Sequence, residues 1–231
     1  MIAIHSLKKT FGSTPVLDVS DLMIAKGESF GLVGNNGAGK TTLFRIILDL
    51  VRPSSGTVMI NGKNVQGNDE WKHYVGSFLD EGFLISYLTP DEYFQFVGKL
   101  HGYSDVDVKA FYHRFEEFFH GEIIGRGKYI RELSKGNLKK VGIAAAFMGN
   151  PQVIILDEPF ENLDPTSQIR LKQLLLEEQK NNSLTYLISS HDLNHVTDLC
   201  QRIVVLEKGS VIKDLKENEN ILAELQAYFQ A

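Results

Sequence analysis

Short apolar runs, separated by glycine, asparagine and serine, dominate the chain from Met1 to about Asp80. They are brief and rich in β-favouring residues, a pattern typical of strands rather than helices. The dipeptide Asn61-Gly62 stands between two of these runs and predicts a hairpin turn. The expected strands are Ile2–Leu7, Val16–Ile24, Ser29–Val33, Thr57–Ile60 and Tyr74–Leu79.

The pattern becomes helical between Pro90 and about Gly149. Aromatic and aliphatic residues recur there at three- and four-residue spacing, as they do on the buried face of a helix. The two clearest sets are Tyr93, Phe94, Val97 and Leu100, and then Phe111, Phe115, Phe118 and Phe119. This stretch predicts a helical insert within a chain of otherwise different pattern.

Strands and helices alternate in the remainder of the chain. Strands are expected at Val153–Leu156, Leu184–Ile188 and Ile203–Leu206, with helices at Pro165–Lys180 and Asp192–Cys200 between them. Strands that alternate with helices of crossover length predict a parallel sheet covered on both faces. Residues 217–231 predict a short terminal helix that carries no chemistry.

A glycine-rich segment after the expected strand Ser29–Val33 fits the pattern G-x-x-x-x-G-K-[ST] and opens a helix-favouring run, which is the context that a phosphate-binding loop requires. Its backbone N–H groups are expected to face an anion, Lys40 to reach the terminal phosphates and Thr41 to ligate Mg²⁺. A plain glycine-rich turn is the less favoured alternative. The expected phosphate-binding residues are Gly34, Asn35, Asn36, Gly37, Ala38, Gly39, Lys40, Thr41 and Thr42.

Two acidic residues, Asp157 and Glu158, directly follow the apolar run Val153–Leu156. Parallel sheets bind their ligands at the carboxyl ends of the strands. Asp157 is therefore expected to hold Mg²⁺, and Glu158 to orient and deprotonate a water for attack on a γ-phosphate. Two solvated acids at the end of a strand are the alternative, which the accompanying phosphate loop disfavours.

Further segments resemble one P-loop class, the ATP-binding-cassette (ABC) ATPases, over nearly the whole chain. Leu133–Asn137 reads L-S-K-G-N and resembles the signature of that family, Asn162–Pro165 resembles its D-loop, and Ser189–Asp192 its switch-histidine loop. The resemblance implies an α/β fold: a P-loop NTPase (RecA-like) core with an N-terminal antiparallel β subdomain and an inserted α-helical subdomain. It also implies ATP and Mg²⁺ as cofactors.

The resemblance further implies how one ABC ATPase domain over residues 1–231 is divided. The catalytic core with the β subdomain is expected at about 1–85 and 150–216. The helical subdomain, which carries the signature, is expected at about 86–149, and a short C-terminal helix at 217–231.

Roles for four more residues follow from the resemblance. Ser134 and Gly136 are expected to bind the ATP held by the phosphate loop of a second subunit. There is also a physical reason, because a hydroxyl and free N–H groups at the start of a helix form an anion site. An ordinary helix cap is the alternative for Ser134. His191 is expected to contact the γ-phosphate and to help position Glu158. Phe11 is expected to stack on the adenine, with a core position as the alternative.

The chain departs from the family pattern where a glutamine usually joins the core to the insert. The stretch from Gly76 to Gly82 contains none; Asp80 is the best match and Glu81 the neighbouring possibility. A carboxylate can still reach Mg²⁺, so Thr41, Asp157 and Asp80 form the expected metal set. A solvated acidic turn is the alternative for Asp80. The signature departs as well, at Lys135 and Asn137, and Lys135 adds positive charge near the phosphates of the partner.

Composition narrows the choice of function. Lys and Arg number 24 and Asp and Glu 29, so no bulk positive field attracts nucleic acid or an anionic membrane. The longest stretch without these residues, Val141–Leu156, is shorter than the roughly 20 residues that span a bilayer. The N-terminus does not resemble a secretory signal, and the single Cys200 excludes an internal disulfide. We expect a cytoplasmic chain, peripheral on the cytoplasmic face of the cell membrane.

The leading hypothesis is an ATP-binding and ATP-hydrolysing subunit of an ABC transporter, with export favoured over import. Its ATP-sandwich dimer, a homodimer or a heterodimer with another ABC ATPase subunit, would drive a separate transmembrane permease that contacts residues 83–93. A soluble ABC ATPase acting on nucleic acid or a macromolecular complex is the alternative. It is disfavoured because a second cassette, a coiled-coil insertion and basic extensions are all missing from the sequence, so no nucleic acid partner is expected. A module that binds ATP without turnover is disfavoured by Glu158 and His191.

Overall fold

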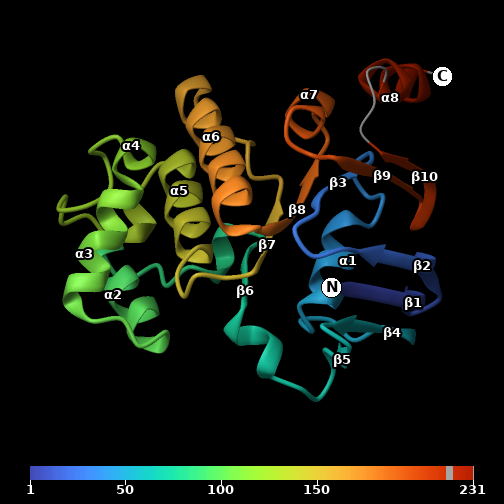
Figure 1. The fold of residues 1–231 in the computed structure, drawn as a ribbon, viewed down its shortest axis with the longest axis horizontal. Coiled ribbons are helices and arrows are strands. Elements are labelled where there is room, and N and C mark those ends of the chain that lie inside the picture. The colour runs from blue at the N-terminus through green and yellow to red at the C-terminus, as the bar shows by residue number, and fades with distance from the viewer. Residues whose placement is uncertain (217–220, 231) are drawn as a thin grey trace.

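The computed structural model describes residues 1–216 and 221–230 (Figure 1). The smaller of its sheets is antiparallel and is formed by β1 (Ile2–Phe11), β2 (Thr14–Ile24), β4 (Ser55–Ile60) and β5 (Lys63–Asn64), in the order β2-β1-β4-β5. Ile60 pairs with Lys63, and Asn61 and Gly62 both have positive φ angles, 51° and 76°. The hairpin predicted at Asn61-Gly62 is therefore confirmed.

The larger sheet has the order β10-β9-β3-β8-β7-β6. Its strands from β9 to β6 run parallel, and β10 pairs antiparallel with β9. The strands are β3 (Ser29–Val33), β6 (Val75–Phe78), β7 (Val153–Asp157), β8 (Thr185–Ser190), β9 (Arg202–Glu207) and β10 (Ser210–Lys216). Every residue of β3, β7 and β8 is buried, which explains why apolar residues predominate in these runs of the sequence.

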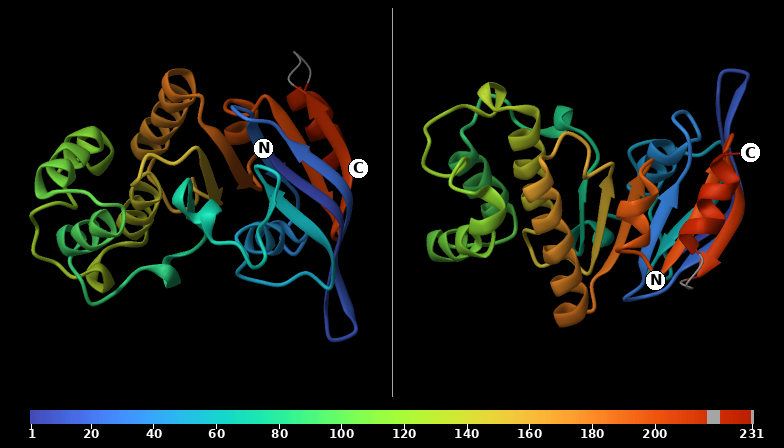
Figure 2. Two further views of the ribbon diagram at one scale, coloured as in Figure 1. Left: turned by 60° about the horizontal axis from the view of Figure 1, so that its bottom comes forward. Right: turned by 90° about the horizontal axis from the view of Figure 1, so that it is seen from above.

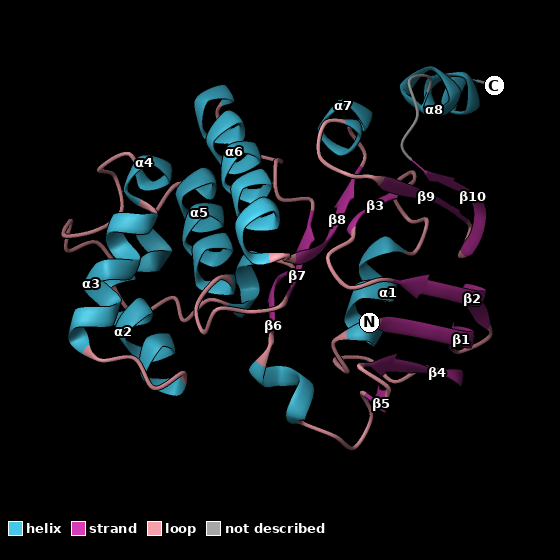
Figure 3. Ribbon diagram, viewed as in Figure 1, coloured by secondary structure: helices cyan, strands magenta, loops and turns pink. Residues whose placement is uncertain are grey.

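Both faces of the larger sheet are covered, as predicted. Successive side chains of β7 point to opposite faces: Val153 and Ile155 pack with α1 (Lys40–Ile47) and the smaller sheet, whereas Ile154 and Leu156 pack with the helical side of the molecule. The antiparallel sheet thus takes the place of helices over part of one face. Figure 3 shows this division, with α5 and α6 on one side of the sheet and α1 with the strands of the smaller sheet on the other.

The helical insert consists of α2 (Pro90–Leu100), α3 (Asp105–Arg114), α4 (Glu116–Phe119) and α5 (Lys135–Ala146), and it lies to one side of the sheets in all views (Figures 1 and 2). Its interior is a cluster of aromatic rings; Phe94 lies 5.5 Å from Phe111 and 5.6 Å from Phe119, between ring centroids. The aromatic spacing in the sequence therefore reflects packing within the insert.

The helices after the insert are α6 (Pro165–Asn182), α7 (Leu193–Thr197) and α8 (Ile221–Gln230). The helix predicted at Asp192–Cys200 is shorter than expected, because Asp192 serves as its N-cap and the helical turns end at Thr197. Of the terminal helix predicted at 217–231, α8 forms the described part, and residues 217–220 and 231 lie outside the described residues. Within the described ranges, no helix is long and apolar enough to cross a membrane.

Candidate functional site

The glycine-rich loop joins β3 to α1, and its glycines are required by the backbone. Gly37 and Gly39 have φ angles of 83° and 107°, in the left-handed region. A Cβ on Gly34 would lie 2.3 Å from the carbonyl oxygen of Leu206 in β9, so the loop also packs closely against the sheet. Lys40, the first residue of α1, is buried and donates a hydrogen bond to the Gly34 carbonyl (2.6 Å). Its ammonium group thus lies within the curve of the loop.

Asp157 ends β7 at the carboxyl edge of the sheet. Its Oδ2 accepts a hydrogen bond from the Thr41 hydroxyl (2.5 Å), and its Oδ1 accepts one from Ser189 of β8. Burial raises the pKa of Asp157, whereas the hydrogen bonds from Ser189 and Thr41 act in the opposite direction. Two of the expected Mg²⁺ ligands, Thr41 and Asp157, therefore meet although they lie far apart in the sequence.

Glu158 is held in a left-handed conformation, with a φ angle of 46°. Its N–H donates to Ser189 Oγ (2.9 Å), and its Oε2 lies 2.9 Å from His191 Nδ1. Its other oxygen, Oε1, lies 3.3 Å from Lys40 Nζ at an angle outside hydrogen-bond geometry, so that contact is an ion pair. The carboxylate therefore bridges the lysine of the phosphate loop and the histidine of the loop after β8.

Lys139 also reaches Glu158, from α5 of the helical insert, and sequence reasoning missed it. Its Nζ donates to the Glu158 carbonyl oxygen (2.8 Å) and lies 4.0 Å from Glu161 Oε2. Burial lowers the pKa of Lys139, and the charges of Glu81, Glu161, Glu158 and Asp157 oppose that effect. A lysine on a helix usually faces solvent, so only the packing of α5 against this turn reveals the contact.

A cavity of about 400 Å³ lies beside this carboxylate pair. All three residues of the expected metal set line it, together with the neighbouring possibility Glu81 and two lysines of α5. The lining residues are Thr41, Arg45, Leu79, Asp80, Glu81, Lys135, Leu138, Lys139, Asp157, Glu158, Glu161 and Asn162. Carboxylate and hydroxyl oxygens are the ligand types that Mg²⁺ prefers, so the donors facing this cavity fit that ion.

Asp80 has partners of its own at the start of the 3₁₀ helix Glu81–Phe83. Its Oδ1 accepts a hydrogen bond from the Gly82 N–H (2.8 Å), and its Oδ2 lies 3.4 Å from Arg45 Nη2. It thus shapes the turn after β6, as the alternative interpretation expects, and it also borders the cavity. The two interpretations of Asp80 are compatible in this geometry.

The signature segment opens α5. Ser134 is the N-cap residue, and its hydroxyl accepts a hydrogen bond from the Asn137 N–H (3.3 Å). A Cβ on Gly136 would lie 2.9 Å from the carbonyl oxygen of Asn162, in the segment that resembles a D-loop. Glycine therefore lets the first turn of α5 approach that backbone closely. Ser134 itself is exposed and accessible to a ligand.

Phe11 ends β1 and is 52% exposed, which excludes the core position left open by the sequence. The ammonium group of Lys9 lies 4.6 Å from its ring centroid. A Cβ on Gly39 would lie 2.8 Å from Leu17 of β2, so β2 borders the phosphate loop. The turn between β1 and β2 projects from the body of the molecule in both views of Figure 2, and Phe11 lies beside it.

Comparison with known proteins gives consistent matches. A family model described as "ABC transporter" matches residues 17–161. The chain is 34% identical to the uncharacterized ABC transporter ATP-binding protein YhaQ of Bacillus subtilis over 220 residues, 95% of this chain and 72% of that protein. It is 33% identical to the bacitracin transport ATP-binding protein BcrA of Enterococcus faecalis over 227 residues, 95% of this chain and 70% of that protein.

A solved structure shares the fold over nearly its full length. It is a dimeric ATP-binding cassette in a post-hydrolysis state, bound to ADP and Pi. The match has a TM-score of 0.81 at 25% identity and covers 94% of this chain and 98% of that one. The P-loop NTPase fold with an antiparallel β subdomain, predicted from the sequence, is confirmed by this similarity and by the sheets described above.

Proposed function

This chain belongs to the ABC transporter family, and we propose that it is the ATP-hydrolysing subunit that drives a separate transmembrane permease through an ATP-sandwich dimer. The observation that carries the proposal is the position of Glu158, held between Lys40 and His191 beside the Thr41–Asp157 pair. ATP hydrolysis is the activity of the family. Export, the direction favoured from the sequence, rests on the resemblance alone.

Hydrolysis follows from the proposed roles of these side chains. The loop N–H groups and Lys40 bind the phosphates, with the ammonium group moving from the Gly34 carbonyl to phosphate oxygens. Glu158 accepts a proton from a water as the water oxygen bonds to the γ-phosphorus and the bond to the bridging oxygen breaks, which gives ADP and phosphate. His191, 2.9 Å from Glu158, keeps that carboxylate oriented and contacts the γ-phosphate.

Mg²⁺ is proposed to be held by Thr41, Asp157 and Asp80. When bound, it neutralises charge that develops on the transferred phosphoryl group. The buried Asp157 supports this assignment, because burial penalises its ionised form and a bound cation would offset that penalty. Asp157 Oδ2 already lies within hydrogen-bond distance of the Thr41 hydroxyl, so both oxygens face the same space.

Two further contacts complete the proposed nucleotide site. The exposed ring of Phe11 stacks on the adenine. Ser134 and Gly136 of one subunit bind the phosphates of the ATP held by the other, whether the dimer is a homodimer or pairs with another ABC ATPase subunit. In this proposal the chain lies at the cytoplasmic face of the cell membrane, held there by its permease.

Replacing Asp80 with asparagine should raise the Mg²⁺ concentration for half-maximal ATP hydrolysis about tenfold, in the range typical for weakened metal-site contacts. Asparagine can still accept the hydrogen bond from the Gly82 N–H, so the turn is preserved while the charge is lost. A Mg²⁺ titration of turnover measures the shift. Glu81→Gln is the matched comparison, because Glu81 lines the same cavity. If only Glu81→Gln shifts the curve, Glu81 is the metal residue; if neither does, the acids serve the turn alone.

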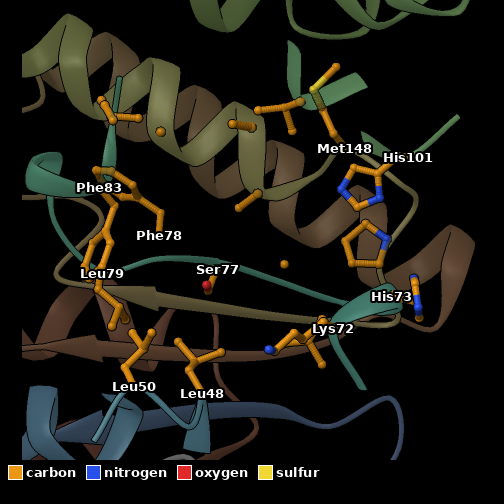
Figure 4. A pocket seen from close by; sticks show the side chains of 18 of the residues that line it. Leu48, Leu50, Lys72, His73, Ser77, Phe78, Leu79, Phe83, His101 and Met148 are labelled. Carbon is orange, nitrogen blue, oxygen red and sulfur yellow. The ribbon is translucent and has the colours of Figure 1, made fainter. Parts of the chain in front are cut away.

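A second cavity, of about 360 Å³, supports a membrane partner. It lies between β6 and α5, and four of its lining residues are small: Gly76, Gly142, Ala145 and Ala146. A Cβ on Gly142 would lie only 2.0 Å from the Phe78 ring, so the close approach of α5 to β6 depends on glycine. Phe83 and Leu50, both more than half exposed, border the opening (Figure 4). Such a cavity fits large apolar side chains of an entering segment.

The two ends of this cavity differ in chemistry. His73 and His101 lie at one end and Phe83 at the other (Figure 4). Lys72 also lines the cavity, from the short 3₁₀ helix Glu70–His73. Burial lowers the pKa of His101, and an approaching carboxylate would raise it again. None of the described lining residues is acidic. We therefore propose that the permease inserts an apolar helix whose carboxylate lies at the end formed by His73 and His101. Lys72 already pairs with the exposed Asp69 (2.6 Å).

Replacing Leu50 with glutamate should reduce recovery of the permease at least about tenfold, because a charge then occupies the apolar opening that is proposed to receive apolar side chains of the partner. A tagged chain is purified from gently solubilised native membranes, and the co-purifying multi-spanning protein is quantified. Leu100→Glu is the matched control: Leu100 is also an exposed leucine, but it lies outside the cavity lining. Equal recovery from both variants would contradict the docking assignment. Recovery of soluble proteins or nucleic acid alone from the unmodified chain would favour the soluble-ATPase alternative.

A further inference from the structure

Two adjacent lysines of α5 are buried, and they contact different parts of the molecule. The Lys139 ammonium group donates to the carbonyl oxygen of Glu158 (2.8 Å). Lys140 instead lies 3.5 Å from Glu122 and 3.9 Å from Asp164. Both side chains are less than one-tenth exposed. Lys139 therefore joins the helical insert to the turn that carries the proposed catalytic base.

The Glu158 turn needs such contacts because its backbone conformation is uncommon. A φ angle of 46° is sparsely populated by residues with a side chain, and it persists where the surroundings hold it. Ser189 Oγ accepts the hydrogen bond from the Glu158 N–H (2.9 Å), and Lys139 donates to the Glu158 carbonyl. The residue is thus held on both sides of its Cα, from β8 and from α5, and these contacts set the direction of its carboxylate.

Burial disfavours the charged form of the Lys139 ammonium group, and neighbouring carboxylates offset part of that cost. Four carboxylates, those of Glu81, Glu161, Glu158 and Asp157, stabilise its charge although the side chain is buried. A hydrogen bond from a charged donor to a carbonyl is also stronger than a neutral one. The hydrogen bond from Lys139 therefore holds the Glu158 turn firmly against α5.

The same helix carries the signature residue Ser134 at its N-cap. Lys139 follows five residues later, which is about 7.5 Å along a helix axis. A shift of α5 relative to the sheet would therefore move both the proposed contact to the ATP of the partner and the group that holds Glu158.

We propose that Lys139 is a positioning residue for ATP hydrolysis. It fixes the Glu158 turn, so that the direction of the Glu158 carboxylate depends on the position of α5. The inference rests on the proposed role of Glu158 as the base. Lys139 does not touch the reacting atoms in this proposal; it acts through the backbone of Glu158.

Replacing Lys139 with methionine should lower kcat at least about tenfold while changing KM and the Kd for ATP by less than about twofold. Methionine keeps the shape of the side chain but removes the donor. Lys139→Gln should restore kcat to within about threefold of the unmodified chain, because its amide can donate to the same carbonyl. Steady-state ATP hydrolysis and ATP binding by the purified full chain measure both quantities, and unchanged ATP binding shows that each variant is folded.

Lys140→Met is the matched control, with the same burial and the same change on the same helix, and it should keep kcat within about twofold. A similar loss of kcat in Lys140→Met would overturn the inference, because any buried lysine of α5 would then suffice. An unchanged kcat in Lys139→Met would also overturn the inference, as would equal losses of kcat in Lys139→Met and Lys139→Gln.

Combination with Glu158→Gln separates this inference from the proposed function. Once the carboxylate is absent, Lys139→Met should cause no further loss of turnover, since interacting sites are non-additive. An additional loss of about tenfold would show that Lys139 acts independently of Glu158 and would overturn the inference alone. If Glu158→Gln itself leaves turnover unchanged, the proposed base is wrong, and the inference falls with it.

Discussion

Glu158→Gln should lower ATP turnover by about 10²- to 10⁴-fold while leaving ATP binding intact, the loss typical of a removed general base. The amide matches the carboxylate in size and can still accept the hydrogen bond from the His191 N–H, which spans 3.2 Å in this structure. It cannot take a proton from the attacking water. Since ATP remains bound and is not cleaved, the ATP-sandwich dimer should accumulate.

Turnover assays and light scattering with and without ATP test this outcome together. Glu161→Gln is the matched control: Glu161 lines the same cavity, but its carboxylate is exposed and lies 4.0 Å from Lys139. That variant should keep turnover within about threefold. Undiminished turnover in Glu158→Gln would show that another group prepares the water.

Lys40→Ala should weaken ATP binding by about 10- to 100-fold, which corresponds to the loss of charged hydrogen bonds to phosphate. The ammonium group is buried inside the phosphate loop, 2.6 Å from the Gly34 carbonyl. Only a short movement of the side chain is therefore needed to reach a phosphate bound there. Alanine also leaves the buried Oε1 of Glu158 without its cation, 3.3 Å away in the intact chain. The variant should therefore be less stable as well.

Titration calorimetry with ATP gives the affinity, and thermal unfolding without ATP gives the stability. Lys26→Ala removes an exposed lysine from the turn before β3 and should alter neither. ATP affinity equal to that of the unmodified chain in Lys40→Ala would rule out the phosphate-loop assignment.

The phosphate loop and the carboxylate pair were predictable because their chemistry depends on residues adjacent in the sequence. Gly37 and Gly39 of the loop adopt the required positive φ angles within one short segment, between β3 and α1. Asp157 and Glu158 follow an apolar run, and such a run marks a buried strand whose end lies at the ligand edge of a parallel sheet. No distant contact had to be known for either prediction.

Other features were missed or left open, because they depend on what packs against them. Strand β10 alternates partly buried and exposed residues, and its antiparallel pairing with β9 gives it its conformation. Phe11 could have been a core residue by type, and only its position at the end of β1 leaves its ring exposed. The sequence did not distinguish Asp80 from the neighbouring acid Glu81, and the fold then placed it beside Arg45 and the cavity lined by Thr41 and Asp157.

The nucleotide-binding chemistry of this protein is encoded in contiguous residues, since backbone N–H groups, a lysine and a hydroxyl of one segment suffice to bind phosphate. The tertiary structure decided how the side chains around the phosphate loop are oriented. Lys139 meets Glu158 across 19 residues of sequence because α5 packs against the edge of the sheet. The cavity between β6 and α5 depends on Gly142, which lets the same helix approach β6 closely. Such contacts depend on the burial of whole helix and sheet faces, which no single segment of the sequence specifies.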